Sequence, residues 1–480
     1  MSVITADYHF TPRMLERMLK NPILDVDSYK ASQWCQYPAL LEFLESYIES
    51  RGGKYKYVVF SGVQRFIKEY LSVPITQQDI DDAEIFWKIH GEPFNREGWE
   101  YIVREHKGYI PVKILSVREG TVVPVHNVLI KAKSTDKNCA WVESYIETAF
   151  LRAIWYPTTV ATVSHSIKQV IKKYMLKTCD NLDNLPFMLH DFGARGASSK
   201  ETAGIGGMAH LLNFKGSDNV TGVLYSMYYY NHPTMTAFSV PAAEHSTITT
   251  WLRKRERQAY ANMLEQFGGK FPIISVVSDS YNIYDAVDIW GDFKDEIIKC
   301  GSMLVIRPDS GDAKSVVIKL LLKLDAKFGH TMNTKGYRVL NHVRILWGDG
   351  IDEESIIDIL TAMMGYGFSA ANIVFGMGGA LLQKIDRDTQ KFAMKASAAI
   401  IDGEEIDVYK EPVDDKGKQS KRGRQMLYDS INGPYTARER TSDDPELLHE
   451  IWDTGILSFD DNFADMRFRT EQIPKDLVLQ

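Results

Sequence analysis

The sequence has little cysteine and no long hydrophobic run. Its four cysteines are scattered over 480 residues without a CxxC pair or a spacing typical of metal ligands, which favours reduced thiols in a cytosolic protein. No stretch of about 18 apolar residues is present, so we expect no membrane span. Residues 1–20 are polar and charged, unlike a signal peptide. These absences predict a cytoplasmic protein.

An excess of positive charge is also missing. The chain has 56 lysines and arginines against 63 aspartates and glutamates, a formal net charge of -7. Nucleic-acid and membrane-surface binding both favour a basic face, so we expect neither partner. The segment 416–424 has five basic residues in nine positions. Such a run indicates either a solvated loop or a local contact with phosphate.

Short apolar runs alternate with helical patterns between residues 156 and 390. This alternation is typical of a parallel sheet. About seven strand–helix units in one run favour a closed or nearly closed α/β barrel over an open sheet. Residues 1–155 and 391–480 have a mixed α+β character. We therefore expect three segments, with the barrel in the middle.

Polar residues follow the apolar runs, where the strands are expected to end. In barrels, the loops after the strands carry the functional groups. Each charge alone could form a structural ion pair, but so many charges at one end of a sheet are costly to bury without partners. The residues concerned are Asp191, Arg195, Asp218, His245, Asp279, Arg307, Asp309 and Asp349.

His245 lies between an apolar run, 238–240, and a helical pattern that continues to Phe267. A histidine where a strand ends and a helix begins is well placed for an anion, because helix N-termini offer free N–H groups. The alternative is a loop histidine bonded to the neighbouring backbone.

Two further strand ends suggest phosphate chemistry. The glycine-rich segment 376–384 is neither a Walker A loop nor a dinucleotide fingerprint, and it indicates a phosphate site or a tight turn. Arg307 and Asp309 stand two residues apart, which suits a phosphorylated sugar, with Arg on phosphate oxygens and Asp on hydroxyls or Mg²⁺. The DFG sequence at 191–193 lacks the other kinase motifs.

Ten segments spread over nearly the whole chain closely resemble the nicotinamide phosphoribosyltransferase family. They are LDVDSYK (24–30), HDFGARG (190–196), SSKETAGIG (198–206), NFKGSDNV (213–220), SVPAAEHST (239–247), SVVSDSYNIY (275–284), IRPDSGD (306–312), WGDGID (347–352), FGMGGALLQK (375–384) and YKEPV (409–413). The resemblance implies an irregular, TIM-like α/β barrel over 156–390 and a discontinuous mixed domain built from 1–155 and 391–480. It also implies a homodimer with active sites at the interface.

The implied reaction joins nicotinamide to phosphoribosyl pyrophosphate in NAD salvage, giving nicotinamide mononucleotide and pyrophosphate. Phe192 and Tyr29 match the two aromatic rings that stack on nicotinamide, with Tyr29 contributed by the partner subunit. Asp218 matches the acceptor of the amide N–H, and a carboxylate there would repel nicotinate. Nicotinate phosphoribosyltransferase and a non-enzymatic interaction protein are the alternative functions.

The resemblance implies Mg²⁺ as cofactor and ATP as co-substrate, with ATP phosphorylating His245. His245, Arg307 and Asp309 are the expected catalytic residues, and Asp279 and Asp309 the expected metal partners. Ala194 stands where vertebrate members of the family have tyrosine. Further substrate contacts are implied for Arg195, Asp279, Arg307, Pro308, Asp309, Gly348, Asp349, Gly378, Gly379 and Arg387. The pyrophosphate and ATP side is implied for Arg51, Arg195, His245, Arg307, Lys395, Lys410 and Lys418.

Overall fold

The computed structural model describes residues 8–414, 419–438 and 443–474. Contacts divide the chain into two compact units. The central unit comprises 163–228 and 232–385, and the terminal unit comprises the described residues up to 162, residues 229–231, and those from 386 onward. The chain passes from one unit to the other at 162/163 and again at 385/386. The domain boundaries expected at 155/156 and 390/391 stay predictions.

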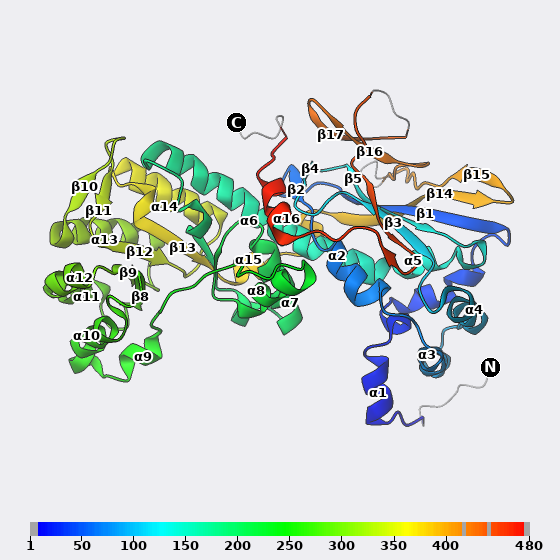
Figure 1. The fold of residues 1–480 in the computed structure, drawn as a ribbon, viewed down its shortest axis with the longest axis horizontal. Coiled ribbons are helices and arrows are strands. Elements are labelled where there is room, and N and C mark those ends of the chain that lie inside the picture. Colours follow the sequence, from blue (N-terminus) through cyan, green and yellow to red (C-terminus); the bar gives the residue numbers. More distant parts are fainter. Residues whose placement is uncertain (1–7, 415–418, 439–442, 475–480) are drawn as a thin grey trace. The chain divides into compact units, whose positions relative to one another are not determined.

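The central unit is built on a six-stranded parallel sheet (Figure 1). The strand order is β7-β6-β13-β12-β9-β8. Their bounds are β6 Leu189–Asp191, β7 Gly216–Ser217, β8 Ile273–Val277, β9 Met303–Arg307, β12 Val343–Trp347 and β13 Ile373–Met377. These six described strands do not pair into a full TIM barrel. Residues 238–240, expected as a strand, instead form one bridge from Phe238 to β7, and Ala242 forms one to β8.

Helices connect the strands of this sheet, and one long helix precedes its first strand. They are α6 Glu147–Thr178, which the unit boundary divides, α7 Lys200–His210, α8 Val220–Tyr229, α9 His245–Thr249, α10 Glu256–Phe267, α11 Ile283–Asp292, α12 Lys294–Cys300, α13 Ala313–Phe328, α14 Glu353–Gly365 and α15 Gly379–Leu382. A small hairpin joins β10 His330–Met332 to β11 Arg338–Leu340.

Local sequence explains where α13 begins and ends. The Asp312 side chain accepts a hydrogen bond from the Ser315 N–H at its start, and Gly329 follows its end with a φ of 76°. An N-cap carboxylate satisfies a free helical N–H, and glycine adopts positive φ readily. The single helix expected up to Phe267 was wrong. Leu252 takes a φ of 65°, and this left-handed residue separates α9 from α10.

The terminal unit contains a seven-stranded sheet in the order β15-β14-β1-β5-β3-β18-β19. The described strands of this sheet pair antiparallel, and β1 from the start of the chain pairs along its length with β14 from the far end. The strands are β1 Leu41–Ser50, β3 Val112–Ser116, β5 Val128–Ser134, β14 Phe392–Ile401, β15 Glu404–Asp407, β18 His449–Asp453 and β19 Ile456–Leu457. Two short ladders join β2 Tyr57–Val59 to β4 Val122–Pro124 and β16 Met426–Ser430 to β17 Gly433–Ala437.

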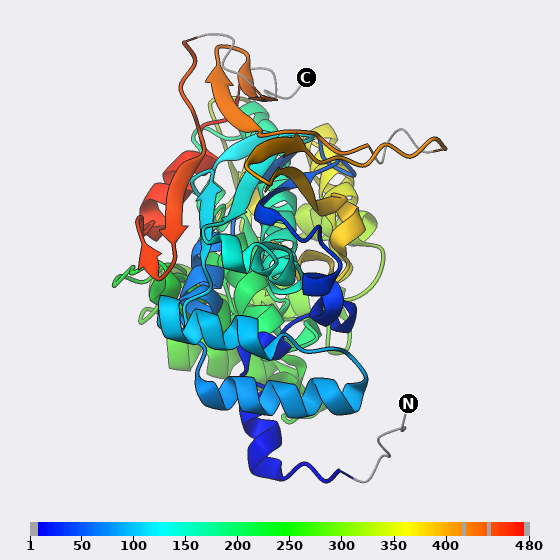
Figure 2. The same cartoon turned by 90° about the vertical axis from the view of Figure 1, so that its right-hand side faces the viewer.

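Helices complete this unit, and α3 and α4 lie side by side in it (Figure 2). Arg96 on α4 joins them through ion pairs to Asp81 and Glu84 on α3. The core is mainly aliphatic, with aromatic side chains that include the fully buried Trp87 and Trp99. The helices are α1 Pro12–Met18, α2 Val63–Phe66, α3 Gln77–His90, α4 Arg96–His106, α5 Val142–Tyr145 and α16 Phe463–Thr470, with a π-helical turn at Ile67–Leu71.

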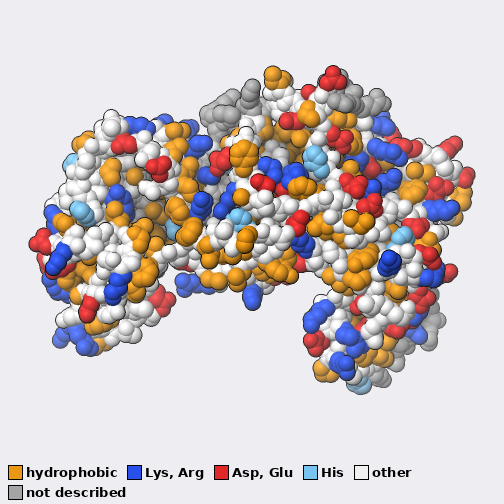
Figure 3. Space-filling view, viewed as in Figure 1, with side chains coloured by type: hydrophobic (Ala, Val, Ile, Leu, Met, Phe, Trp, Pro, Cys, Tyr) orange, Lys and Arg blue, Asp and Glu red, His pale blue; other side chains and the backbone are white. Residues whose placement is uncertain are grey.

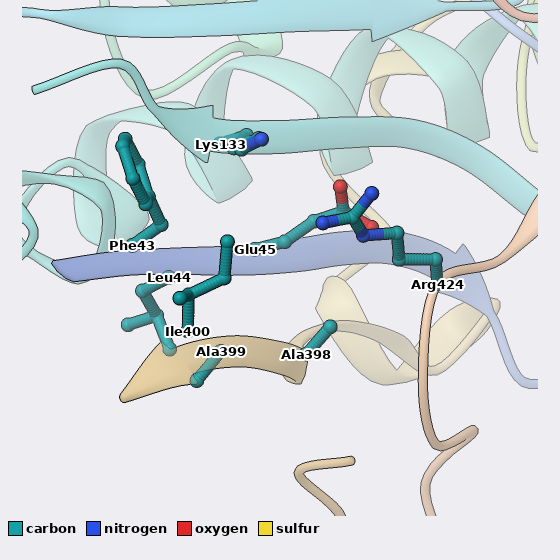
Figure 4. Close-up of a pocket in the computed structure, with 8 residues that line it drawn as sticks. All are labelled: Phe43, Leu44, Glu45, Lys133, Ala398, Ala399, Ile400 and Arg424. Atoms are coloured by element: carbon teal, nitrogen blue, oxygen red, sulfur yellow. The ribbon is translucent and has the colours of Figure 1, made fainter. Parts of the chain in front are cut away.

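The surface carries both signs of charge. Acidic and basic side chains are interspersed on the face in Figure 3. Within the described residues, no helix combines the length and the apolar character needed to cross a bilayer. A hollow over β1, β5 and β14, lined by Glu45, Lys133 and Arg424 among others, holds only about 10 Å³ (Figure 4). That space is about one water molecule, so this hollow is no substrate site.

Candidate active site

A pocket of about 400 Å³ opens at the carboxyl ends of the parallel strands in the central unit. Residues directly after the strands reach it, because parallel strands end at the same edge of a sheet. The lining residues are Phe192, Ala194, Arg195, Gly196, Asp218, Arg307, Asp309, Gly348, Asp349, Gly378 and Gly379. The structure thus brings together nine residues that the sequence analysis expected at a ligand site.

Phe192 owes its position to a glycine in the neighbouring strand. The Phe192 N–H donates to the Met377 carbonyl at 3.0 Å. A Cβ added at Gly376 would overlap Cδ2 and Cε2 of the Phe192 ring. Gly376 therefore lies in β13 and makes room for the ring. The sequence analysis included Gly376 in a phosphate turn and missed this role, since no local signal shows what lies on a neighbouring strand.

Asp191 is buried beneath the pocket and does not line it. Its carboxylate accepts from the Gly193 N–H at 2.7 Å and from Nδ2 of Asn219 at 2.8 Å. Burial raises the pKa of Asp191 to about 6. Asp191 therefore joins the turns after β6 and β7, and its expected place on the rim was wrong. Asn219, also buried, was not singled out from the sequence.

His245 begins α9 and faces two carboxylates. Its Nδ1 lies 3.0 Å from Oγ of Ser280, and its Nε2 lies 3.6 Å from Oδ2 of Asp309 and 3.8 Å from Oδ1 of Asp279. His245 does not itself line the pocket, but it lies next to Asp309, which does. The His245 ring thus contacts side chains from other loops. The alternative of a loop histidine bonded to the neighbouring backbone was wrong.

The acidic pair beside His245 has unsatisfied acceptor capacity. Oδ2 of Asp279 accepts from the Asp309 N–H at 2.9 Å and from the Ser310 hydroxyl at 2.6 Å, whereas its buried Oδ1 has no hydrogen-bond partner among the described residues. Burial raises the pKa of Asp309, and the Arg307 charge opposes this shift. Carboxylate oxygens of this kind fit a hard cation such as Mg²⁺.

Direct coordination of one ion by His245, Asp279 and Asp309 together is not supported. Among the described residues, the close group of three metal-type ligands is His106, Asp136 and Cys139 in the terminal unit. In that group Oδ2 of Asp136 already bonds Nε2 of His106 at 2.8 Å. A Mg²⁺ ion near Asp279 and Asp309 would therefore complete its shell with water or ligand oxygens.

Arginines supply positive charge to the pocket. Arg195 is exposed in the turn after β6, and Arg307 ends β9. Nε of Arg307 is buried and has no hydrogen-bond partner in the part of the chain that the structure describes. An unpaired donor beside a polar pocket is well placed for an anionic ligand, because the guanidinium fork matches phosphate oxygens. Pro308 between Arg307 and Asp309 is buried and does not line the pocket.

The other expected residues belong to the terminal unit. Tyr29 and Lys395 line a second pocket, of about 480 Å³, within that unit. Burial lowers the pKa of Lys395. Arg51 pairs with Glu49 at 2.9 Å, and its buried Nη2 has no hydrogen-bond partner within residues 8–414, 419–438 and 443–474. Arg387 and Lys410 are exposed in the same unit, and Lys418 lies outside the described residues.

Comparison with known proteins identifies the family. Residues 187–463 match the model of the nicotinate phosphoribosyltransferase (NAPRTase) family, and residues 21–114 match that of the nicotinamide phosphoribosyltransferase N-terminal domain. The chain belongs to the nicotinate phosphoribosyltransferase family. This places it among the pentosyltransferases of NAD biosynthesis.

Relatives in this family match almost end to end. A nicotinamide phosphoribosyltransferase of Xanthomonas campestris pv. campestris is 50% identical over 92% of this chain and 96% of its own. One from Acinetobacter baylyi is 28% identical over 94% and 97%. A nicotinate-nucleotide pyrophosphorylase from Pyrococcus furiosus has a TM-score of 0.63 at 15% identity, covering 99% of this chain and 100% of that one, a likeness of fold alone.

Proposed function

We propose that the protein is a nicotinamide phosphoribosyltransferase, forming nicotinamide mononucleotide and pyrophosphate from nicotinamide and phosphoribosyl pyrophosphate. The observation that carries this proposal is one pocket lined by an aromatic ring, Phe192, a carboxylate, Asp218, and two arginines, Arg195 and Arg307. A ring and an amide acceptor suit nicotinamide, and the guanidinium groups suit phosphate and pyrophosphate.

The geometry supports a simple division of labour. Cleavage of the glycosidic C–O bond builds positive charge on the ribose and negative charge on the leaving pyrophosphate. Arg195 and Arg307 stabilise the leaving group, while Phe192 holds the pyridine ring in line for attack by its nitrogen. No residue has to remove a proton, because that nitrogen carries a free lone pair. Mg²⁺ held near Asp279 and Asp309 would add positive charge for the pyrophosphate.

Asp218 selects the amide. An ionised carboxylate accepts hydrogen bonds and donates none, so it can accept an N–H from nicotinamide and repels the carboxylate of nicotinate. Nicotinate phosphoribosyltransferase is the rival activity within the same family.

Product analysis tests the proposal. The purified protein is incubated with phosphoribosyl pyrophosphate and equal amounts of nicotinamide and nicotinate, and both mononucleotides are quantified by mass spectrometry. We expect nicotinamide mononucleotide in large excess. Equal formation of the two products would overturn the Asp218 argument, and nicotinate mononucleotide alone would establish the rival activity.

ATP is proposed as a co-substrate that phosphorylates His245. The supporting observation is a histidine ring at the pocket edge, held by Ser280 and next to Asp309. A phosphorylated ring would change the charge of the pyrophosphate side and so couple ATP hydrolysis to synthesis.

A homodimer is proposed because part of the expected site lies in the terminal unit. Tyr29 is 57% exposed and shares its pocket with Lys395. We infer that a second copy supplies Tyr29, together with some of the basic residues Arg51, Lys395 and Lys410, to the pocket of the first. We also infer that 238–242 closes the parallel sheet into an irregular barrel, since its bridges reach both edge strands.

A further inference from the structure

The short segment after Thr236 runs beside β7 and places a serine next to the expected amide acceptor. The Phe238 N–H donates to the Lys215 carbonyl at 2.8 Å, and the Phe238 carbonyl accepts from the Ser217 N–H at 3.2 Å. This parallel pairing is a single bridge between Gly216 and Phe238. Ser239 directly follows Phe238, and Asp218 lies two residues after Gly216, so the bridge brings the two side chains into contact.

Contact between the two side chains is short and directional. Oγ of Ser239 lies 2.5 Å from Oδ1 of Asp218. Since an ionised carboxylate only accepts, the serine hydroxyl is the donor, and hydrogen bonds to a charged acceptor are the stronger kind. The Asp218 N–H is anchored separately, by the Asp191 carbonyl at 3.0 Å. Hydrogen bonds therefore fix both the backbone of Asp218 and its Oδ1.

The second oxygen of Asp218 remains for a ligand. Oδ2 accepts no hydrogen bond from the described residues, and Asp218 lines the pocket with Phe192. Without Ser239 the carboxylate would rotate about χ2, which is a broad torsion for aspartate. A freely rotating acceptor has to be ordered when the ligand binds, and that ordering lowers affinity.

We propose that Ser239 is a positioning residue that sets the preference for nicotinamide: it holds Oδ1 of Asp218, so that Oδ2 faces the substrate amide. The proposal rests on the proposed function, because it takes Asp218 as the amide acceptor. It predicts an effect on nicotinamide affinity and on discrimination against nicotinate, with little effect on the chemical step.

The test is a double-mutant cycle with Ser239→Ala, Asp218→Ala and the double variant. KM and kcat are measured for each variant with nicotinamide and with nicotinate. Nicotinamide binding is also measured by calorimetry, so that affinity is obtained even for a variant with a low kcat. We expect Ser239→Ala to raise the nicotinamide KM about five- to tenfold, with kcat changed less than about twofold. Ser239→Thr, which keeps the hydroxyl, should restore the wild-type KM. In the Asp218→Ala background, Ser239→Ala should have no further effect.

A matched control is Thr334→Ala. Thr334 also donates its hydroxyl to a carboxylate, Oδ1 of Asp180, at 2.6 Å on an exposed loop, and neither residue lines the pocket. This variant should leave the nicotinamide KM unchanged.

The outcomes separate the inference from the function it rests on. An unchanged nicotinamide KM in Ser239→Ala, or equal KM effects of that change with and without Asp218, would overturn the positioning role. If Asp218→Ala itself left nicotinamide affinity and nicotinate discrimination unchanged, the amide-acceptor role would fail instead. A fall in kcat without a rise in KM would also contradict the proposal.

Discussion

At the scale of single residues, the side chains with the clearest chemistry are defined by neighbours that are distant in sequence. His245 is held by Ser280 and faces Asp279 and Asp309, which come from the ends of β8 and β9. Local sequence leaves open whether such a histidine bonds backbone or side chains. The contacts across strands decide it.

His245→Ala should remove ATP coupling and leave synthesis. With the ring gone, no nitrogen is available to take the γ-phosphate, whereas Phe192, Asp218 and Arg307 still bind the other substrates. We expect ATP hydrolysis and transfer of label from [γ-³²P]ATP to protein to be lost, while nicotinamide mononucleotide still forms slowly without ATP. His330→Ala is the control, because His330 bonds Asp325 at 2.6 Å on an exposed hairpin. Labelling of His245→Ala would contradict the phosphohistidine.

Glu143 is a buried acid outside both pockets. Its Oε2 accepts from the Ser46 hydroxyl at 3.1 Å, and its Oε1 has no hydrogen-bond partner in the described part of the chain. Burial raises its pKa to about 8. In the unfolded chain a glutamate has a pKa near ~4.3. As pH rises between these two values the unfolded state releases the proton first, so the free energy of unfolding falls.

Glu143→Gln should remove this pH dependence, because glutamine is neutral throughout. The free energy of unfolding of the variant, relative to that of the wild type, should therefore increase by on the order of a few kcal/mol between pH ~5 and pH ~8. Thermal unfolding at both pH values measures it. The control Glu97→Gln, at an exposed position on α4, should shift Tm equally at both. An equal shift for Glu143→Gln would show that Glu143 does not change its protonation on folding.

At the scale of elements, adjacent strands divide the work of building the pocket wall. β6 supplies Phe192 directly after its end, and β13 supplies the space at Gly376 in which the ring lies. The two strands pair in parallel, with Gly376 opposite His190. A side chain at Gly376 would thus act on substrate stacking without touching the substrate.

Gly376→Ala should displace the Phe192 ring and raise the nicotinamide KM about tenfold, because the ring can no longer lie against β13. Steady-state kinetics with nicotinamide measures this, and circular dichroism checks that the fold is retained. Gly365→Ala, where an added Cβ meets no atom within 4 Å, is the matched control and should leave KM unchanged. A wild-type KM in Gly376→Ala would show that the ring position does not matter for binding.

At the scale of the whole molecule, the expected site residues are divided between two units. Phe192, Asp218 and Arg307 belong to the central unit, while Tyr29, Lys395 and Arg387 belong to the terminal unit. The terminal unit draws on both ends of the chain, since β1 pairs with β14. A dimer in which each copy completes the other's pocket accounts for this division.

Mixing two inactive variants tests that arrangement. Co-expressed Tyr29→Ala and Asp218→Ala chains form a mixed dimer with one site that has both residues intact, if the sites are shared between copies. Random pairing then returns about a quarter of the wild-type activity. Asp218→Ala mixed with Arg307→Ala is the control, because both changes lie in the central unit and no mixed site is repaired. No recovery in the first mixture would place Tyr29 and Asp218 in the site of one copy.

The local order of strands, helices and motifs follows from the amino-acid sequence alone, and the motifs indicate the family. A strand end followed by a charged or glycine residue is a local pattern, so nine pocket residues were predictable from it and from the resemblance. Only the tertiary structure decided that Asp191 is buried, that Gly376 admits Phe192, and that Ser239 holds Asp218. These are contacts between strands, and they depend on long-range pairing and packing, which no periodicity along the chain encodes.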